Sequence, residues 1–139
     1  MLELRGVNTF YGSIPALRDV SLSVREGEIV TLIGANGAGK TTTLMTVCGG
    51  IQPRSGEILY EGKPIHRTRP NEIVRMGISQ VPEGRLIFPK LTVQENLDMG
   101  AFLRRDRDGI RRDMDYIFAL FPILAQRRRQ AGGPLSGGE

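Results

Sequence analysis

The sequence predicts an α/β fold, and three observations lead to this prediction. Residues 28–33 form an almost continuously apolar, β-branched run, which is typical of a strand buried on both faces of a parallel sheet. A glycine-rich stretch at residues 34–39 and a helix-forming segment at residues 40–48 follow at once. Strand-like and helix-like segments then alternate along the chain without an internal repeat, which is the order expected of an α/β protein.

The amino-terminal part predicts an antiparallel sheet. Residues 2–7 and 21–24 alternate apolar and polar side chains, and the second segment is followed by a turn at Glu26-Gly27. This pattern is typical of strands with one exposed face. Residues 57–61 predict a further strand, which Gly62 closes.

The middle of the chain predicts shorter elements. Residues 40–48 favour a helix that ends at Gly49-Gly50, since glycine accepts the left-handed conformation that closes many helices. Residues 73–76 predict a short helix, and residues 78–81 predict a second buried strand. Pro82 ends that strand because proline cannot donate to a strand ladder.

Helices are predicted after residue 91. Thr92 and Glu95 match a capping box, in which each side chain bonds the backbone of the other, so a helix is expected over residues 93–103. A later helix should end before Pro122 or kink there. Its apolar face is given by positions at helical spacing, namely Ile110, Met114, Ile117, Phe118 and Phe121.

Composition excludes several classes of protein. The chain has 139 residues, 40% of them hydrophobic, and its longest apolar stretches fall far short of the roughly 20 residues that span a bilayer. Cys48 is the only cysteine, and the first residues do not resemble a signal peptide, so a cytoplasmic protein is expected. The net charge of +4 and the arginine runs indicate a solvated face or an acidic partner.

Residues 34–41 carry the clearest chemistry. They fit the pattern G-x-x-x-x-G-K-[ST] between a predicted strand and a predicted helix, which is typical of a phosphate-binding loop. We expect backbone N–H groups to surround the phosphates of ATP, Lys40 to pair with the β- and γ-phosphates, Thr41 to bind Mg²⁺, and Thr42 to serve the α-phosphate side. The binding residues expected here are Gly34, Ala35, Asn36, Gly37, Ala38, Gly39, Lys40, Thr41 and Thr42. The alternative is a turn that merely joins strand to helix.

Together with Tyr11 and the final residues 135–139, this loop makes the whole chain resemble the ATP-binding subunit of an ABC transporter. The resemblance implies that Tyr11 stacks on adenine, although a strand-end core aromatic is the structural alternative. It also implies that Ser136 and Gly138, within a Leu-Ser-Gly-Gly-Glu motif, reach the γ-phosphate held by an opposite subunit. Glu139 departs from the Gln usual in that motif.

Glu83 stands where most members of that family carry a Gln that senses the γ-phosphate and Mg²⁺. The resemblance implies a catalytic and metal-linked role for Glu83, and a solvated loop carboxylate is the alternative. Residues 81–85, together with Phe88 and residues 91–97, resemble an ATPase subunit of branched-chain amino-acid importers. The alternatives are a urea or other amide or amino-acid importer, and an ABC ATPase without a transport role.

The resemblance implies the fold of a P-loop NTPase of the ABC ATPase type, with an antiparallel β subdomain and an incomplete helical subdomain. Residues 1–91 are expected to form the ATP-binding core and residues 92–139 to begin the helical subdomain. In this family an Asp, a Glu and a His of the hydrolytic site follow the motif at residues 135–139. We therefore expect a fragment of a longer ATPase that is inactive alone.

The partners implied by the resemblance are a second ABC ATPase subunit, membrane permease subunits and, indirectly, a solute-binding protein outside the membrane. No nucleic acid is expected. The expected location is the cytoplasmic face of the plasma membrane, as a peripheral subunit. The expected cofactors are ATP and Mg²⁺.

Overall fold

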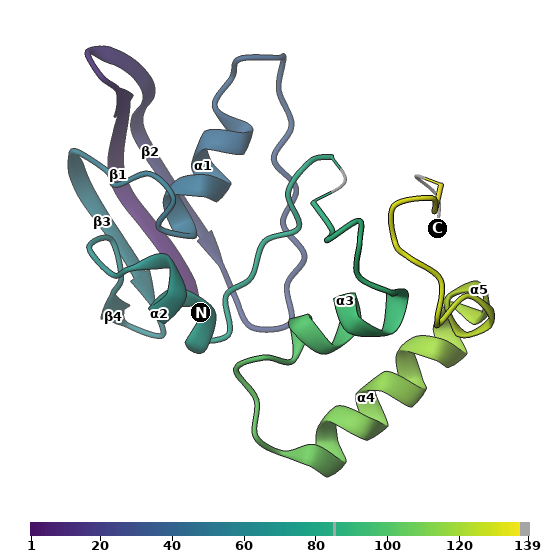
Figure 1. Cartoon of the computed structure of the whole chain (residues 1–139). Coiled ribbons are helices and arrows are strands. Elements are labelled where there is room, and N and C mark those ends of the chain that lie inside the picture. The colour runs from purple at the N-terminus through teal and green to yellow at the C-terminus, as the bar shows by residue number, and fades with distance from the viewer. Residues whose placement is uncertain (85, 137–139) are drawn as a thin grey trace. The chain divides into compact units, whose positions relative to one another are not determined.

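The computed structural model describes residues 1–84 and 86–136, which divide into two compact units, Met1–Val81 and Pro82–Glu139 (Figure 1). Within the described ranges, the first unit contains the strands and two helices, and the second contains three helices. Among the described residues, no helix has the length and apolar character needed to cross a membrane.

The first unit is built on an antiparallel sheet with the strand order β2-β1-β3-β4 (Figure 1). Its strands are β1 (Leu2–Tyr11), β2 (Ile14–Val24), β3 (Ser55–Tyr60) and β4 (Lys63–Pro64). β1 pairs with both β2 and β3, and all pairs are antiparallel. The sheet predicted from alternation at the amino end is confirmed, and its first two strands are longer than expected.

An irregularity in β1 determines which side chains reach the core. Leu4 and Val7 are three positions apart, so regular alternation would send them to opposite faces of the sheet. The register with β2 and with β3 shifts after residues 4 and 5, and both Leu4 and Val7 are buried. Gly6 has a φ of +56°, and a Cβ on Gly56 would lie 2.4 Å from the Gly6 carbonyl oxygen. The bulge therefore depends on close contact between two glycines.

Two helices complete this unit, α1 (Lys40–Val47) and α2 (Pro70–Arg75). The helix predicted after the glycine-rich loop and the short helix near residue 73 are both confirmed. The hydroxyls of Thr9 in β1 and Thr46 in α1 lie 3.3 Å apart in the interior, which joins helix and sheet. The buried core comprises Leu4, Val7, Leu17, Val47, Ile58 and Ile65.

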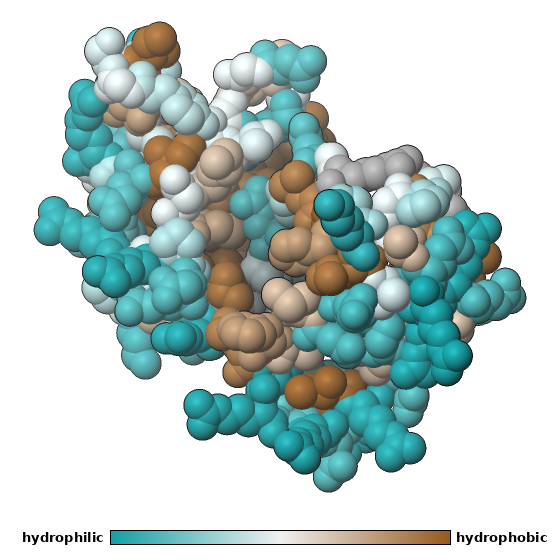
Figure 2. All heavy atoms as spheres, in the orientation of Figure 1, coloured by the Kyte–Doolittle hydropathy of each residue, from teal (hydrophilic) through white to brown (hydrophobic). Residues whose placement is uncertain are grey.

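Two predicted strands are wrong. Residues 28–33 and 78–81 form no strand, and the side chains of Ile29, Ile33 and Val81 are 95%, 92% and 97% exposed. A strand buried on both faces needs a hydrogen-bonded neighbour and covering side chains. No strand of the described residues pairs with either segment. Apolar residues also gather at the surface on the face shown in Figure 2, where brown atoms lie among teal ones.

The second unit contains α3 (Val93–Gly100), α4 (Arg107–Leu120) and α5 (Pro122–Gln126). The capping box is confirmed: the Thr92 hydroxyl accepts from the Glu95 N–H at 3.2 Å, and the Glu95 carboxylate accepts from the Thr92 N–H at 2.7 Å. α3 ends at Gly100, earlier than expected, and α4 ends before Pro122 as predicted.

The start of α3 is fastened to the chain that follows α5. The Val93 and Gln94 N–H groups, which have no partner inside their own helix, donate to the carbonyls of Gln130 and Arg128 at 2.9 and 3.0 Å. Asn96 ties α3 to the segment before it, because its side chain accepts from the Phe88 N–H at 2.8 Å and donates to the Thr92 carbonyl at 2.9 Å. The segment leading to residues 135 and 136 is thus tied to the first turn of α3.

Candidate functional site

The glycine-rich loop enters α1 through a tight turn. The Ala38 N–H donates to the Ala35 carbonyl at 3.1 Å, and Gly37 has a φ of +83°. A Cβ on Gly34 would lie 3.1 Å from the Cβ of Ala38, so the two ends of the turn approach closely. The loop is therefore a compact ring of backbone whose geometry depends on residues without a large side chain.

Gly39 fixes the end of the loop against the sheet. It is the N-cap of α1 with a φ of +91°, a value that favours glycine. A Cβ at this position would lie 2.7 Å from Leu17 Cδ2 and 3.1 Å from the Ala16 carbonyl oxygen, both in β2. The absence of this Cβ lets the start of α1 pack on β2, which holds the helix amino terminus in place.

Lys40 lies across the loop. Its Nζ donates to the carbonyl oxygens of Gly34 and Ala35 at 2.7 and 2.8 Å. These contacts hold the ammonium group beside the turn rather than out in solvent. The cation therefore stands next to the backbone that the sequence predicts as the phosphate cradle.

The four threonines of α1 divide into two pairs. The Thr43 hydroxyl donates to the Gly39 carbonyl at 2.9 Å, and the Thr46 hydroxyl donates to the Thr42 carbonyl at 2.7 Å. The hydroxyls of Thr41 and Thr42 make no hydrogen bond within the described part of the chain. Of these two threonines, which the sequence predicts as binding residues, Thr41 is exposed and therefore open to a ligand, whereas Thr42 is buried.

The start of α1 has the electrostatics of an anion site. No side chain caps its amino terminus, and its first turn contains no acidic residue. The N–H groups of a first helical turn have no partner inside the helix, and the helix dipole places about half a positive charge there. Together with the Lys40 ammonium, these groups can bind the oxygens of a phosphate.

Tyr11 lies at the end of β1, where the hairpin turns through Gly12 into Ile14 of β2. Its side chain is 50% exposed, so one aromatic surface is open to a planar ligand. Arg54, which the sequence analysis did not single out, donates to the Gly12 carbonyl at 2.7 Å and covers the ring of Phe10. Nothing in the local pattern of residues 51–56 indicates an arginine that contacts a turn so distant in the sequence.

The roles of the other predicted site residues stay predictions. Glu83 is exposed and belongs to the second unit, so its link to Thr41 and Mg²⁺ stays a prediction. Ser136 is the last described residue, and Gly138 lies outside the described residues, as do Gly137 and Glu139. Within residues 1–84 and 86–136, no group of three or more His, Cys, Asp or Glu side chains could hold a metal.

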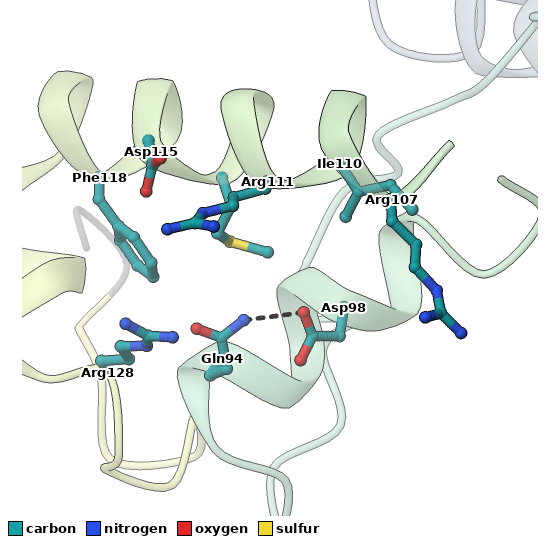
Figure 3. Close-up of a pocket in the computed structure, with 9 residues that line it drawn as sticks. Gln94, Asp98, Arg107, Ile110, Arg111, Asp115, Phe118 and Arg128 are labelled. Atoms are coloured by element: carbon teal, nitrogen blue, oxygen red, sulfur yellow. Dashed lines mark hydrogen bonds between the residues drawn. The ribbon is translucent and has the colours of Figure 1, made fainter. Parts of the chain in front are cut away.

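A groove of about 420 Å³ lies between α3 and α4 in the second unit. Ile110 and Phe118 of α4 point toward α3, where Gln94 Nε2 donates to Asp98 at 2.7 Å (Figure 3). The Arg128 guanidinium lies 5.4 Å from the centre of the Phe118 ring. Charged residues of both signs line the groove: Asp98, Arg107, Arg111, Asp115 and Arg128. This mixture favours a polar surface contact over a site for a small anion.

Comparison with known proteins shows the family of the chain. Residues 17–139 match the family model described as ABC transporter. The chain is 52% identical over its whole length to the high-affinity branched-chain amino acid transport ATP-binding protein BraG of Pseudomonas aeruginosa. It spans 59% of the length of that relative. It is also 34% identical to the ribose import ATP-binding protein RbsA 2 of Rhizobium etli, across 98% of this chain and 28% of that protein.

Solved structures agree with this assignment. A structure of the ATP-binding subunit of an ABC transporter superposes with a TM-score of 0.85 at 30% identity, covering 99% of this chain and 57% of the other. An ATP-binding cassette in its ADP conformation superposes with a TM-score of 0.78 at 26% identity, covering 99% and 59%. The predicted ABC ATPase fold is confirmed. The chain belongs to the ABC transporter family, whose members bind and hydrolyse ATP.

Proposed function

We propose that this chain is the nucleotide-binding part of an ATPase subunit that powers the import of branched-chain amino acids. The observation that carries the nucleotide site is the uncapped start of α1 beside the Lys40 ammonium. The choice of solute rests on the 52% identity to BraG along the whole chain.

In this proposal residues 34–39 and the first turn of α1 surround the triphosphate of ATP. Lys40 moves from the Gly34 and Ala35 carbonyls to the β- and γ-phosphates, because a charge-assisted bond to phosphate is stronger than a bond to a neutral carbonyl. Tyr11 stacks on the adenine base, and Thr42 bonds the α-phosphate side. Residues 34–38 and Tyr11 are exposed, whereas Thr42 is buried.

Mg²⁺ fits the same site through Thr41, whose hydroxyl is exposed and makes no hydrogen bond among the described residues. Mg²⁺ prefers oxygen ligands and is usually held by few protein groups together with phosphate oxygens and water, so one hydroxyl agrees with its chemistry. When bound, the ion supplies positive charge that neutralises the phosphate oxygens. Glu83 is proposed to contact a metal-bound water.

Residues 1–91 then bind nucleotide, and residues 92–139 begin a helical part that contacts membrane permease subunits. Ser136 and Gly138 act on the nucleotide held by a second ATPase subunit, and a solute-binding protein acts only through the permease. The chain alone binds ATP without hydrolysing it. The complete subunit lies on the cytoplasmic face of the plasma membrane.

A chimaera tests this function. The aligned amino-terminal part of BraG is replaced by this chain in Pseudomonas aeruginosa cells that lack BraG, and uptake of labelled leucine is measured. We expect uptake to return, because the 139 exchanged residues supply the nucleotide site and the permease contacts. The same chimaera with Lys40→Ala should be expressed equally and should not transport.

Two outcomes would contradict the proposal. A well-expressed chimaera without leucine uptake would separate this chain from branched-chain amino-acid import. Equal uptake by the chimaera and by its Lys40→Ala variant would show that the phosphate loop does not power transport. Uptake of labelled urea, measured in cells with the corresponding urea permease, distinguishes the alternative solute.

A further inference from the structure

The tip of the β1–β2 hairpin extends beyond the third strand of its sheet. The last residue pair between β1 and β3 is Asn8 with Ser55. From Thr9 to Tyr11, β1 pairs only with β2 among the described strands. A ribbon of two strands is only marginally stable in water, so the position of the tip requires additional contacts.

Arg54 supplies such contacts from the residue immediately before β3. Its backbone N–H donates to the Asn8 carbonyl at 2.7 Å, which fixes where the side chain starts. Its guanidinium donates to the Gly12 carbonyl at 2.7 Å and lies 3.9 Å above the centre of the Phe10 ring. A planar guanidinium suits both roles because it stacks on an aromatic face while its edge donates hydrogen bonds.

These contacts act on the two residues that flank Tyr11. Phe10 and Tyr11 are neighbours in a strand, so their side chains point to opposite faces of the hairpin. Arg54 covers the Phe10 ring and bonds Gly12, and the side chain of Tyr11 remains 50% exposed. Arg54 forms no ion pair with a described residue, so its side chain serves the hairpin tip.

We propose that Arg54 is a positioning residue for the nucleotide base: it clamps the hairpin tip so that Tyr11 presents its ring to adenine. This inference rests on the proposed nucleotide site and on the stacking role of Tyr11. A ring held in its binding position loses less conformational freedom when the base binds, which raises affinity. The contribution concerns the base alone, because Arg54 contacts neither the phosphate loop nor α1 in the described residues.

The test compares two ligands that share their phosphates. The 139-residue chain is titrated by calorimetry with Mg²⁺-ATP and with Mg²⁺-tripolyphosphate, which has no base. We expect Arg54→Ala to weaken ATP binding by roughly threefold to tenfold, the size expected for one exposed cation–π contact and one hydrogen bond, and to leave tripolyphosphate binding unchanged. Arg54→Lys should lie between the wild type and Arg54→Ala. Arg5→Ala is the matched control, since Arg5 is an exposed arginine of β1 whose guanidinium bonds the Glu3 carboxylate.

A double-mutant cycle with Tyr11→Ala sharpens the result. Tyr11→Ala should weaken ATP binding by roughly tenfold, within the range for loss of one base–aromatic stack, and spare tripolyphosphate. Adding Arg54→Ala to Tyr11→Ala should cause no further loss, because the clamp has nothing left to position. The chain contains no tryptophan, so Tyr11→Trp gives a single fluorophore at the tip, whose anisotropy should fall when Arg54→Ala is added.

The possible outcomes distinguish a failure of this inference from a failure of the proposed nucleotide-binding function. If neither ligand binds the wild type, the proposed phosphate site is wrong. If ATP and tripolyphosphate bind equally, the stacking role of Tyr11 is wrong. If Tyr11→Ala lowers only ATP binding while Arg54→Ala has no effect, or lowers binding of both ligands alike, the positioning role of Arg54 is overturned and the function stands.

Discussion

β1 and residues 28–33 are both rich in strand-forming side chains, yet only β1 is a strand. β1 has a hydrogen-bonded neighbour on each side, and Leu4 and Val7 are buried in a core that includes Val47 of α1. Residues 28–33 have no pairing strand among the described residues, and Ile29 and Ile33 are almost fully exposed. The comparison shows that a side chain with high β propensity packs well in a sheet that already has paired strands, but does not by itself produce a strand.

The proposed phosphate loop, residues 34–39, lies between these two kinds of structure. Its first residue, Gly34, follows the unpaired segment directly, whereas Gly39 packs on β2 and begins α1. The Lys40 ammonium joins the two ends of the loop by bonding the carbonyls of Gly34 and Ala35. The sheet therefore holds the helix end of the loop, at Gly39, whereas the other end, at Gly34, is held by contacts within the loop.

The largest expected effect is on the free energy of unfolding, and it comes from comparing a buried isoleucine with an exposed one. Ile58→Ala in β3 should lower the free energy of unfolding by about 2–5 kcal/mol, because Ile58 is 1% exposed and its loss leaves a cavity. Ile29→Ala should change that free energy by less than about 0.5 kcal/mol, as for other exposed positions. Urea unfolding followed by circular dichroism measures both. Equal losses would mean that residues 28–33 are as buried as β3.

Substitution of the loop glycines should come next. Gly39→Ala combines a positive φ with a Cβ only 2.7 Å from Leu17, so we expect a cost of about 2–4 kcal/mol and a matching loss of Mg²⁺-ATP affinity. Gly37→Ala is the control, since its φ is also positive but nothing lies within 4 Å of its Cβ position. It should cost about 1–2 kcal/mol. Equal effects of the two substitutions would argue against the packing of Gly39 on β2.

A smaller effect is expected in the second unit. Thr92→Ala removes the cap of α3 and should cost about 1 kcal/mol in unfolding free energy. Thr92→Ser keeps the hydroxyl that accepts from the Glu95 N–H, so it should stay close to the wild type. Urea unfolding of the two variants provides the measurement. If Thr92→Ser were as unstable as Thr92→Ala, loss of the cap would not be the cause of the instability.

The smallest effect concerns pH. Hydrogen bonds from the Thr92 backbone and then from its hydroxyl lower the pKa of Glu95. A carboxyl whose folded pKa is lowered stabilises the fold above its unfolded pKa, and this contribution is lost as the pH falls through the folded value. The unfolding free energy should therefore decline below about pH 4.5 by a small amount that Glu95→Gln removes. An identical acid profile for Glu95→Gln would contradict this assignment.

Much of the fold could be predicted because its signals are local. The alternation in β1 and β2, the Thr92–Glu95 capping box and the stop at Pro122 each depend on a few neighbouring residues. The incorrect strands at residues 28–33 and 78–81 show the limit of this approach, since their pattern describes a surface that needs partners. The bulge at Gly6 was missed because it depends on contact with Gly56, far away in the sequence.

The candidate site likewise has features that local sequence predicts and features that only the structure reveals. The spacing of residues 34–41 predicts the loop, and the structure adds how the hydroxyls differ: Thr43 and Thr46 bond backbone carbonyls, Thr42 is buried, and Thr41 is exposed. The periodicity of the sequence cannot distinguish these threonines, because their hydrogen bonds depend on which side-chain rotamer each adopts against the preceding turn. Arg54 was missed since its contacts with Phe10 and Gly12 cross between strands that are not consecutive.

The most direct test of the account is the affinity of the chain for Mg²⁺-ATP with and without the Lys40 ammonium. Lys63→Ala is the matched control, because Lys63 is an exposed lysine of β4 in the same unit. Isothermal calorimetry should show that the wild type and Lys63→Ala bind alike and that Lys40→Ala loses at least roughly tenfold, the cost of one charge-assisted contact. Equal affinities for all three chains, with their circular dichroism unchanged, would contradict the assignment of residues 34–41 as the phosphate-binding loop.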